Sequence, residues 1–482
     1  MTPPPCPRIA RSPSNKANKT QLRPRKVRYI RLCGGVFACG TGRHHTCAGR
    51  RCVDLILCLC YNQIKLTGEG ENAMSVSMLL AAAAAVGFLY ALGQGVLRLF
   101  GKAPAREPAA RGKAPAQRLV FGVALLWCAV MLTALCMAAW LQQPELSPLE
   151  AVRSALCGGL DARHYLDLAQ WGYGAAEDGF AEQYLMIVFF PLWGWLLRPF
   201  ALLGADLWLV GTVLAVLLTA AGTVLLYRCA FRLTGNRRTA GFACAVQLAM
   251  PGSFFFVLPQ TEALFYFLNF AFLDAMQRRR LGLAGVFGLL AALCRANGIL
   301  LAGYAVAWAV LALRRKEKLR PAWLLPVIGP AVGILVYLLL NWKVYGNAFQ
   351  FTIYQQEHWH HSFCLFPQAI VNMCRYADFE SSLGIYIGLW TVAVILLEIL
   401  VYVLAAKKLR PDWLLLGLAG VLMMNGQTWL ISAQRYALGM PALPCAVTAL
   451  SEKRWVRTAL LAALAVFWAI YFAAFIGHAP IY

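Results

Sequence analysis

One short segment of the chain combines an acid, a histidine and a tyrosine at a spacing that suits a binding or reactive site. If the run that starts at Asp161 is helical, the side chains of Asp161, His164, Tyr165 and Leu168 share one face. Asp161 and His164 could therefore address the same ligand. A carboxylate held beside a hydroxyl group can take up its proton, so this face has the residue types for acid–base chemistry.

Three more charged residues lie at the ends of apolar runs. Glu262 begins one run, Arg295 lies between two others, and Arg435 follows a fourth. An arginine in an apolar hairpin is costly unless it is paired, and its planar fork of donors suits a phosphate group. Arg295 is therefore either a phosphate ligand or the salt-bridge partner of Glu262. Arg435 is a similar candidate, or a side chain that extends to the membrane surface.

The composition predicts the kind of structure that positions these residues. Of the 482 residues, 60% are hydrophobic and 13% are charged, whereas soluble domains have about 45–50% and about 25%. Lipid solvates apolar side chains, and helices satisfy the backbone polar groups. We therefore predict an all-α polytopic integral membrane protein with about 10–12 membrane segments. The apolar runs lie near residues 75–97, 119–141, 206–227, 239–257, 261–276, 282–296, 298–313, 322–340, 383–404, 412–431, 436–450 and 458–476.

Basic residues gather between the apolar runs and predict the orientation. The formal charge of +23 could indicate nucleic acid, but clusters between apolar runs follow the positive-inside rule, so we expect no nucleic acid partner. With the clusters in the cytoplasm, the opposite side receives a long first extracytoplasmic loop, 142–205, and a second loop, 341–382. The residues singled out above all fall on that side. The run 185–203 contains prolines and is predicted to be interfacial or re-entrant.

The first 73 residues differ from the rest of the sequence. Residues 1–73 are basic, contain several cysteines and lack a long apolar run. Gly68-Glu69-Gly70-Glu71 would be encoded by purine-rich codons just before Met74, as a bacterial ribosome-binding site would be. We predict that translation starts at Met74 and that 74–482 forms the membrane domain. The alternative is a disordered basic tail.

Short motifs occur in a fixed order over about 280 residues. The first set comprises Asp161, His164-Tyr165, Leu168-Ala169, Gly172-Tyr173 and Phe189-Phe190-Pro191-Leu192. The later set comprises Pro251-Gly252-Ser253, Thr261-Glu262-Ala263-Leu264-Phe265, Arg295-Ala296-Asn297-Gly298, Gly346-Asn347, Phe351, Gln355, Trp359, Arg435-Tyr436 and Pro441. In this order the motifs resemble those of the PIG-V family of GPI mannosyltransferases and its bacterial relatives.

The resemblance implies the GT-C fold of multi-span glycosyltransferases. It also implies transfer of mannose from a polyprenyl-phosphate carrier, with inversion of the anomeric centre. A direct displacement needs one base to take the proton of the acceptor hydroxyl, and Asp161 is the predicted catalytic base. The alternative role for Asp161 is a helix N-cap, which aspartate favours. Asp167 is a second candidate base, but its helical position points elsewhere.

The resemblance also implies which residues bind the substrates. They are His164, Tyr165, Glu262, Arg295, Gln355, Trp359 and Arg435. His164 would position the donor or the acceptor, or else be structural, and Glu262 would bind sugar hydroxyls or pair with an arginine. No cofactor or metal site is predicted, although three histidines near residue 360 leave a divalent metal open.

The predicted function is a membrane hexosyltransferase, with mannose as the expected sugar. Its partners would be a lipid-linked sugar donor, membrane lipids and a glycan, glycolipid or protein acceptor. A bacterial plasma membrane is the expected location, or the endoplasmic reticulum membrane in a eukaryote. The alternative is a transporter or flippase of lipid-linked sugars, which would place ionisable residues near the membrane midplane. Asp274 and Glu398 are the main residues that fit this alternative.

Overall fold

The structure, a computed structural model, describes residues 71–101, 114, 116–157, 161–174, 183–477 and 479. These residues belong to one compact unit, Cys60–Tyr482. The described part is helical and has no β-strand, only one isolated bridge between Phe363 and Gln427. The prediction for residues 1–73 lies, as far as residue 70, outside the described residues.

The described part of the chain consists of helices joined by loops of different lengths. The α-helices are α2 Glu71–Phe100, α3 Gln117–Gln142, α4 Pro148–Cys157, α5 Asp161–Trp171, α6 Pro191–Leu202, α7 Leu207–Thr234, α8 Arg237–Ala249, α9 Thr261–Gln277, α10 Leu281–Cys294, α11 Leu300–Arg314, α12 Leu325–Tyr345, α13 Gln350–Trp359, α14 Phe366–Cys374, α15 Trp390–Ala405, α16 Pro411–Met424, α17 Ala433–Leu438, α18 Leu443–Leu450 and α19 Arg454–Ile476. Four short 3₁₀ helices and one π-helix complete the list: η1 Gln183–Val188, η2 Ser253–Val257, η3 Ala296–Ile299, η4 Pro321–Leu324 and the π-helix η5 Gly384–Leu389.

Seven helical segments of the described part are long and apolar enough to cross a membrane. They are Val76–Phe100, Gln117–Gln142, Leu207–Thr234, Ala296–Arg314, Pro321–Tyr345, Gly384–Ala405 and Arg454–Ile476. Large apolar side chains on them are exposed, such as Leu126 at 66% and Val466 at 59%. Lipid would cover these side chains favourably. The chain is therefore an all-α polytopic integral membrane protein, as its composition predicts.

Several other predicted segments are shorter than a span, which needs about 20 residues. The run 239–257 consists of α8, with 13 residues, followed by η2. The run 436–450 is divided between α17 and α18. The run 185–203 forms η1 and the 12-residue helix α6, which is too short to cross a membrane by itself. Polar side chains near the ends of such short helices lie inside the bundle, as Glu262 and Arg435 do.

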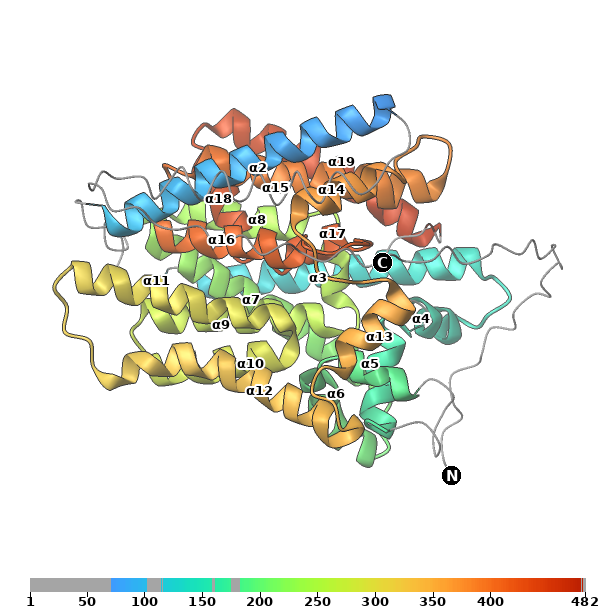
Figure 1. The fold of residues 1–482 in the computed structure, drawn as a ribbon. Coiled ribbons are helices and arrows are strands. Elements are labelled where there is room, and N and C mark those ends of the chain that lie inside the picture. Colours follow the sequence, from blue (N-terminus) through green and yellow to red (C-terminus); the bar gives the residue numbers. More distant parts are fainter. Residues whose placement is uncertain are drawn as a thin grey trace, which may run out of the picture. The chain divides into compact units, whose positions relative to one another are not determined.

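The segments predicted to be extracytoplasmic gather at one end of the bundle. Figure 1 shows α4, α5, α6 and α13 close together at the end opposite the loop that joins α11 to α12. That loop carries basic residues of the cluster at 314–320. Helix α5 packs on α6, and α13 contacts η1. The predicted first loop and the second loop therefore meet at the same end of the described bundle.

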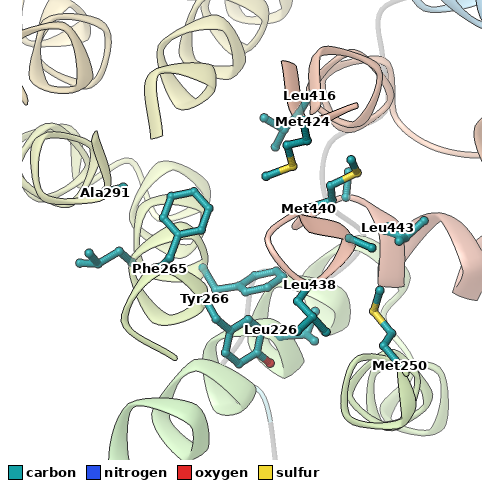
Figure 2. Packing of buried hydrophobic residues seen from close by; sticks show 14 of the residues in the cluster. Leu226, Met250, Phe265, Tyr266, Ala291, Leu416, Met424, Leu438, Met440 and Leu443 are labelled. Atoms are coloured by element: carbon teal, nitrogen blue, oxygen red, sulfur yellow. The ribbon is translucent and has the colours of Figure 1, made fainter. Parts of the chain in front are cut away.

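Helix α9 lies in the centre of the packed core. Almost every residue of α9 is buried, including polar ones such as Glu262 and Asn269. Figure 2 shows Phe265 and Tyr266 of α9 among side chains from other helices, including Leu226 of α7 and Met424 of α16. Because other helices surround most of α9, a charge at either end of it needs a partner within the protein.

Helices α10 and α12 approach each other closely along a line of glycines. A Cβ atom added to Gly329 would overlap the carbonyl oxygen of Gly285, and one added to Gly333 would overlap that of Leu289. Small residues of this kind allow membrane helices to pack backbone against backbone. The contact holds α10 in place, and the end of α10 carries Arg295.

We predict that Gly329→Val lowers the free energy of unfolding by about 1–3 kcal/mol, because the added side chain forces α12 away from α10. Gly303→Val is the matched control, since a Cβ at Gly303 meets no atom within 4 Å, and its effect should stay within about 0.5 kcal/mol. Thermal unfolding in detergent micelles measures both. Equal melting of the two variants would contradict the close packing of these helices.

Candidate functional site

Four distant segments of the chain bring charged side chains to one place. Asp161 is the first residue of α5, and Glu262 lies in the first turn of α9. Arg295 is the extended residue between α10 and η3, and Arg435 lies in the short helix α17. All four residues are at helix ends or breaks, where side chains can converge without interrupting a long helix. We refer to these four residues as the acid–arginine cluster.

Arg435 connects the two acids of the acid–arginine cluster. Its Nη2 donates to Oδ2 of Asp161 at 2.5 Å, and its Nε donates to Oε1 of Glu262. Arg295 donates from Nη2 to the same Oε1 of Glu262 at 2.6 Å. One guanidinium thus links α5, α9 and α17, and the second adds the end of α10. Charge-assisted bonds of this type are the strong ones in proteins.

Uncharged neighbours orient the arginines. Nε of Arg295 donates to Oγ1 of Thr261 at 3.1 Å, which fixes the plane of that guanidinium. The guanidinium carbon of Arg435 lies 5.3 Å from the centre of the Phe255 ring, a cation–π distance. Phe255 lies in η2 and Thr261 is the first residue of α9, so these two neighbouring elements position both arginines.

The face of α5 predicted from spacing is present. The ring of His164 stacks on Phe189 with a centroid distance of 5.0 Å, and Tyr165 meets the same ring edge-on at 5.2 Å. Burial raises the pKa of Tyr165, so its phenol stays protonated at neutral pH. Phe189 therefore holds the two neighbours of Asp161 in fixed orientations.

Exposure divides the cluster into a buried half and an accessible half. The side chains of Glu262 and Arg435 are 1% and 5% exposed, whereas those of Arg295 and Asp161 are 14% and 33% exposed. Two carboxylates and two guanidiniums balance in charge, which makes their burial tolerable. A ligand approaching the cluster would meet Asp161 and Arg295 first.

The ionisation of the cluster follows from its pairing. Burial works to raise the pKa of Asp161, but the charge and hydrogen bond of Arg435, together with the charges of Arg295 and His164, bring that pKa below its usual value. Burial alone would lower the pKa of Arg435, yet Asp161 and Glu262 raise it. Asp161 is therefore a carboxylate, and not a carboxylic acid, at neutral pH.

Three atoms of the cluster lack a hydrogen-bond partner among the described residues. Oε2 of Glu262 is buried and accepts no hydrogen bond from any residue in the described ranges. Nη1 of Arg295 donates to no described residue either, and it is not among the buried polar atoms. A buried acceptor without a donor is costly. Oδ1 of Asp161 likewise has no partner among the described residues, so the cluster has two unpaired acceptors and one unpaired donor.

The carboxylate of Asp161 does not cap helix α5. The carboxylate of Asp161 forms its hydrogen bond with Arg435, and no amide in the described part of α5 donates to it. Asp167, the second candidate base, points to another partner: its carboxylate lies 3.6 Å from Nε of Arg163. Only Asp161 of the two belongs to the cluster.

Two of the expected substrate-binding residues lie apart from the cluster. Gln355 and Trp359 are on α13, which contacts η1 and α12, and neither has a hydrogen bond to the four charged residues in the described part of the chain. His358 packs edge-on against Tyr184 and Tyr354 at 5.9 Å from each ring. No group of three potential metal ligands occurs among the described residues.

Sequence reasoning did not identify some residues that complete the site. Thr261 and Phe189 stood in the quoted motifs but were not predicted to act there, and Phe255 lay outside every motif. The signal for Thr261 was its place directly before Glu262 at the start of an apolar run. Phe255 carried no comparable signal, because its contact with Arg435 joins residues that are distant in sequence.

Comparisons with protein-family models, with curated protein sequences and with solved structures give no match. A functional assignment for the cluster therefore depends on its geometry and on the motifs quoted above.

We predict that Arg435→Met destabilises the protein by about 3–5 kcal/mol, because it leaves Glu262 and Asp161 without their shared partner. Arg454→Met, at an exposed position, is the matched control and should change stability by no more than about 0.5 kcal/mol. Thermal unfolding in detergent is the measurement. Similar melting of both variants would show that the cluster does not stabilise the fold.

The stability of the wild type and that of Arg435→Met should also depend differently on pH, which thermal unfolding over a range of acidic pH values measures. In the wild type the folded-state pKa of Asp161 is lowered, so its ion pair stabilises the fold fully above the ordinary value of about 3.9 and is lost as the pH falls through the lower folded-state value. In Arg435→Met the largest of the opposing charges is lost and only Arg295 and His164 still oppose burial, so the pKa of Asp161 rises and acid removes less stability than in the wild type.

Proposed function

We propose that the chain is a membrane glycosyltransferase that moves a hexose, with mannose as the expected sugar, from a polyprenyl-phosphate donor to an extracytoplasmic acceptor. The observation that carries the proposal is the carboxylate of Asp161, one third exposed, next to the arginine pair. This arrangement supplies a proton acceptor and an anion-binding group within one site. The motif resemblance adds the expectation of a GT-C enzyme.

Asp161 is suited to the part of a general base. Its Oδ2 is held by Arg435, while its Oδ1 has no bond to a described residue and the side chain is 33% exposed. In the proposed reaction the acceptor oxygen attacks the anomeric carbon of the donor and its proton passes to Asp161. The bond between that carbon and the phosphate oxygen breaks, and the electron pair leaves with the phosphate. One displacement of this kind inverts the anomeric centre.

Arg295 is suited to hold the departing phosphate. Its Nη1 donates to no described residue, and a guanidinium pairs well with phosphate oxygens. The negative charge that develops on the leaving group would be stabilised there without any movement of the buried Arg435. Glu262, through the unpaired Oε2, would accept a hydroxyl of the sugar.

A flippase of lipid-linked sugars is the second candidate function, and Glu398 is the observation that favours it. This glutamate is 3% exposed within the apolar segment Gly384–Ala405, where it accepts a hydrogen bond from Asn425 at 2.6 Å. An ionisable residue inside a membrane segment is commonly functional. A flippase would move the lipid-linked sugar without forming a new glycosidic bond, so a transfer assay separates the two candidates.

We predict that Asp161→Asn lowers sugar transfer by about 10²–10⁴-fold, which is the usual contribution of a general base. The assay follows radiolabel from polyprenyl-phosphate mannose into membrane acceptors. Asp167→Asn is the matched control: it is the same substitution on the same helix, and it should keep transfer near the wild-type rate because Asp167 faces Arg163. Expression and membrane insertion are compared by immunoblot. Full transfer by Asp161→Asn would remove this residue from its proposed role.

A further inference from the structure

The end of α9 that is remote from the acid–arginine cluster has a different electrostatic character. Glu262 and Asp274 lie on this one helix twelve residues apart, which corresponds to about 18 Å at 1.5 Å per residue. At Asp274 a single carboxylate meets three arginines. Oδ1 lies 2.7 Å from Nη1 of Arg232, and Oδ2 is paired with Arg228 and lies 3.2 Å from Nε of Arg278.

This second cluster is not charge-balanced. One negative charge against the three arginines leaves a net charge of +2, and the exposed Arg280 beside it makes +3. The Nε atom of Arg228 is buried and has no acceptor in the described part of the chain. Partly buried positive charge of this size attracts an anion. By the positive-inside rule this end of the helices faces the cytoplasm.

A cavity of about 430 Å³ opens beside these arginines. Arg228, Arg278 and Arg280 line one part of it, together with Asp274. The rest of the lining is apolar and comes from α3, α7, α9 and α10; it includes Phe121 near the start of α3, and Leu283 and Phe287 in the first half of α10. Leu283 is 46% exposed, so the apolar wall continues onto the outer surface of α10, where lipid would lie.

We propose that this cavity binds an anionic phospholipid, with its phosphate between Arg278 and Arg280 and an acyl chain along Phe287 and Leu283. The cavity has both arginines and apolar side chains in its lining, and this combination favours an anionic lipid over other ligands. A soluble anion would not contact the apolar wall, and a zwitterionic lipid would leave the positive charge of the arginines uncompensated. Basic pockets between membrane helices on the cytoplasmic side suit anionic headgroups. The proposal is independent of the sugar transfer discussed above.

The test uses the full chain, purified in a neutral detergent and titrated with phosphatidylglycerol or phosphatidylcholine while native mass spectrometry counts bound lipids. We expect phosphatidylglycerol to bind in preference to phosphatidylcholine. Arg278→Gln with Arg280→Gln should weaken phosphatidylglycerol binding by about tenfold or more. Arg228 and Arg232 still hold Asp274 in this variant. The matched control is Lys453→Gln with Arg454→Gln, which removes the same charge from exposed positions outside the cavity and should leave binding unchanged.

Three results would overturn the proposal: equal loss in both double variants, no loss in either, or displacement of the lipid by millimolar inorganic phosphate. Equal loss would indicate a general surface charge, and displacement would indicate a site for free phosphate. If the Arg278 and Arg280 variant does not fold, Phe287→Ala answers the question, because it keeps every charge and shortens the apolar wall. It should also weaken phosphatidylglycerol binding, and unchanged binding there would contradict the proposed acyl-chain contact.

Discussion

The guanidinium of Arg435 is the group on which the arrangement of the α5 end of the bundle depends. It is almost fully buried, and it bonds to carboxylates from α5 and α9. A buried charge is tolerable only when it is paired and hydrogen-bonded, so neither acid can move far without exposing the other charges to an apolar environment. Four segments that are distant in sequence are thereby fixed at one point. The only members of this cluster with appreciable exposure, Asp161 and Arg295, are those left to meet a ligand.

The two ends of α9 illustrate how charge balance and chemical role go together. At Glu262 two acids balance two arginines, and the resulting site is neutral with a single accessible carboxylate. At Asp274 one acid faces three arginines, and the excess positive charge lies beside an apolar cavity. The first arrangement suits proton transfer from a neutral hydroxyl, whereas the second suits stable binding of an anionic headgroup.

Much of this could be predicted from the sequence, because membrane helices and the α5 face follow from hydropathy and from local spacing. The spacing of Asp161, His164 and Tyr165 predicted their common face, and the cost of an unpaired arginine in an apolar hairpin predicted a partner for Arg295. The breaks at α17 and η2, however, depend on tertiary packing. The pairing of Arg435 with Asp161 joins residues 274 positions apart, and no local pattern indicates it. The order of the motifs also could not show that Gln355 and Trp359 lie apart from the cluster, because the position of α13 depends on tertiary packing.

In the proposed orientation the acid–arginine cluster and the arginines around Asp274 face opposite sides of the membrane. Cysteine-accessibility labelling in sealed vesicles of known sidedness tests it, with a membrane-impermeant maleimide and the wild-type chain as the background. Gln170→Cys, at an exposed position of α5, should be labelled from the extracytoplasmic side without permeabilisation. Arg280→Cys should be labelled from that side only after permeabilisation. Labelling of both positions from the same side of intact vesicles would contradict this orientation.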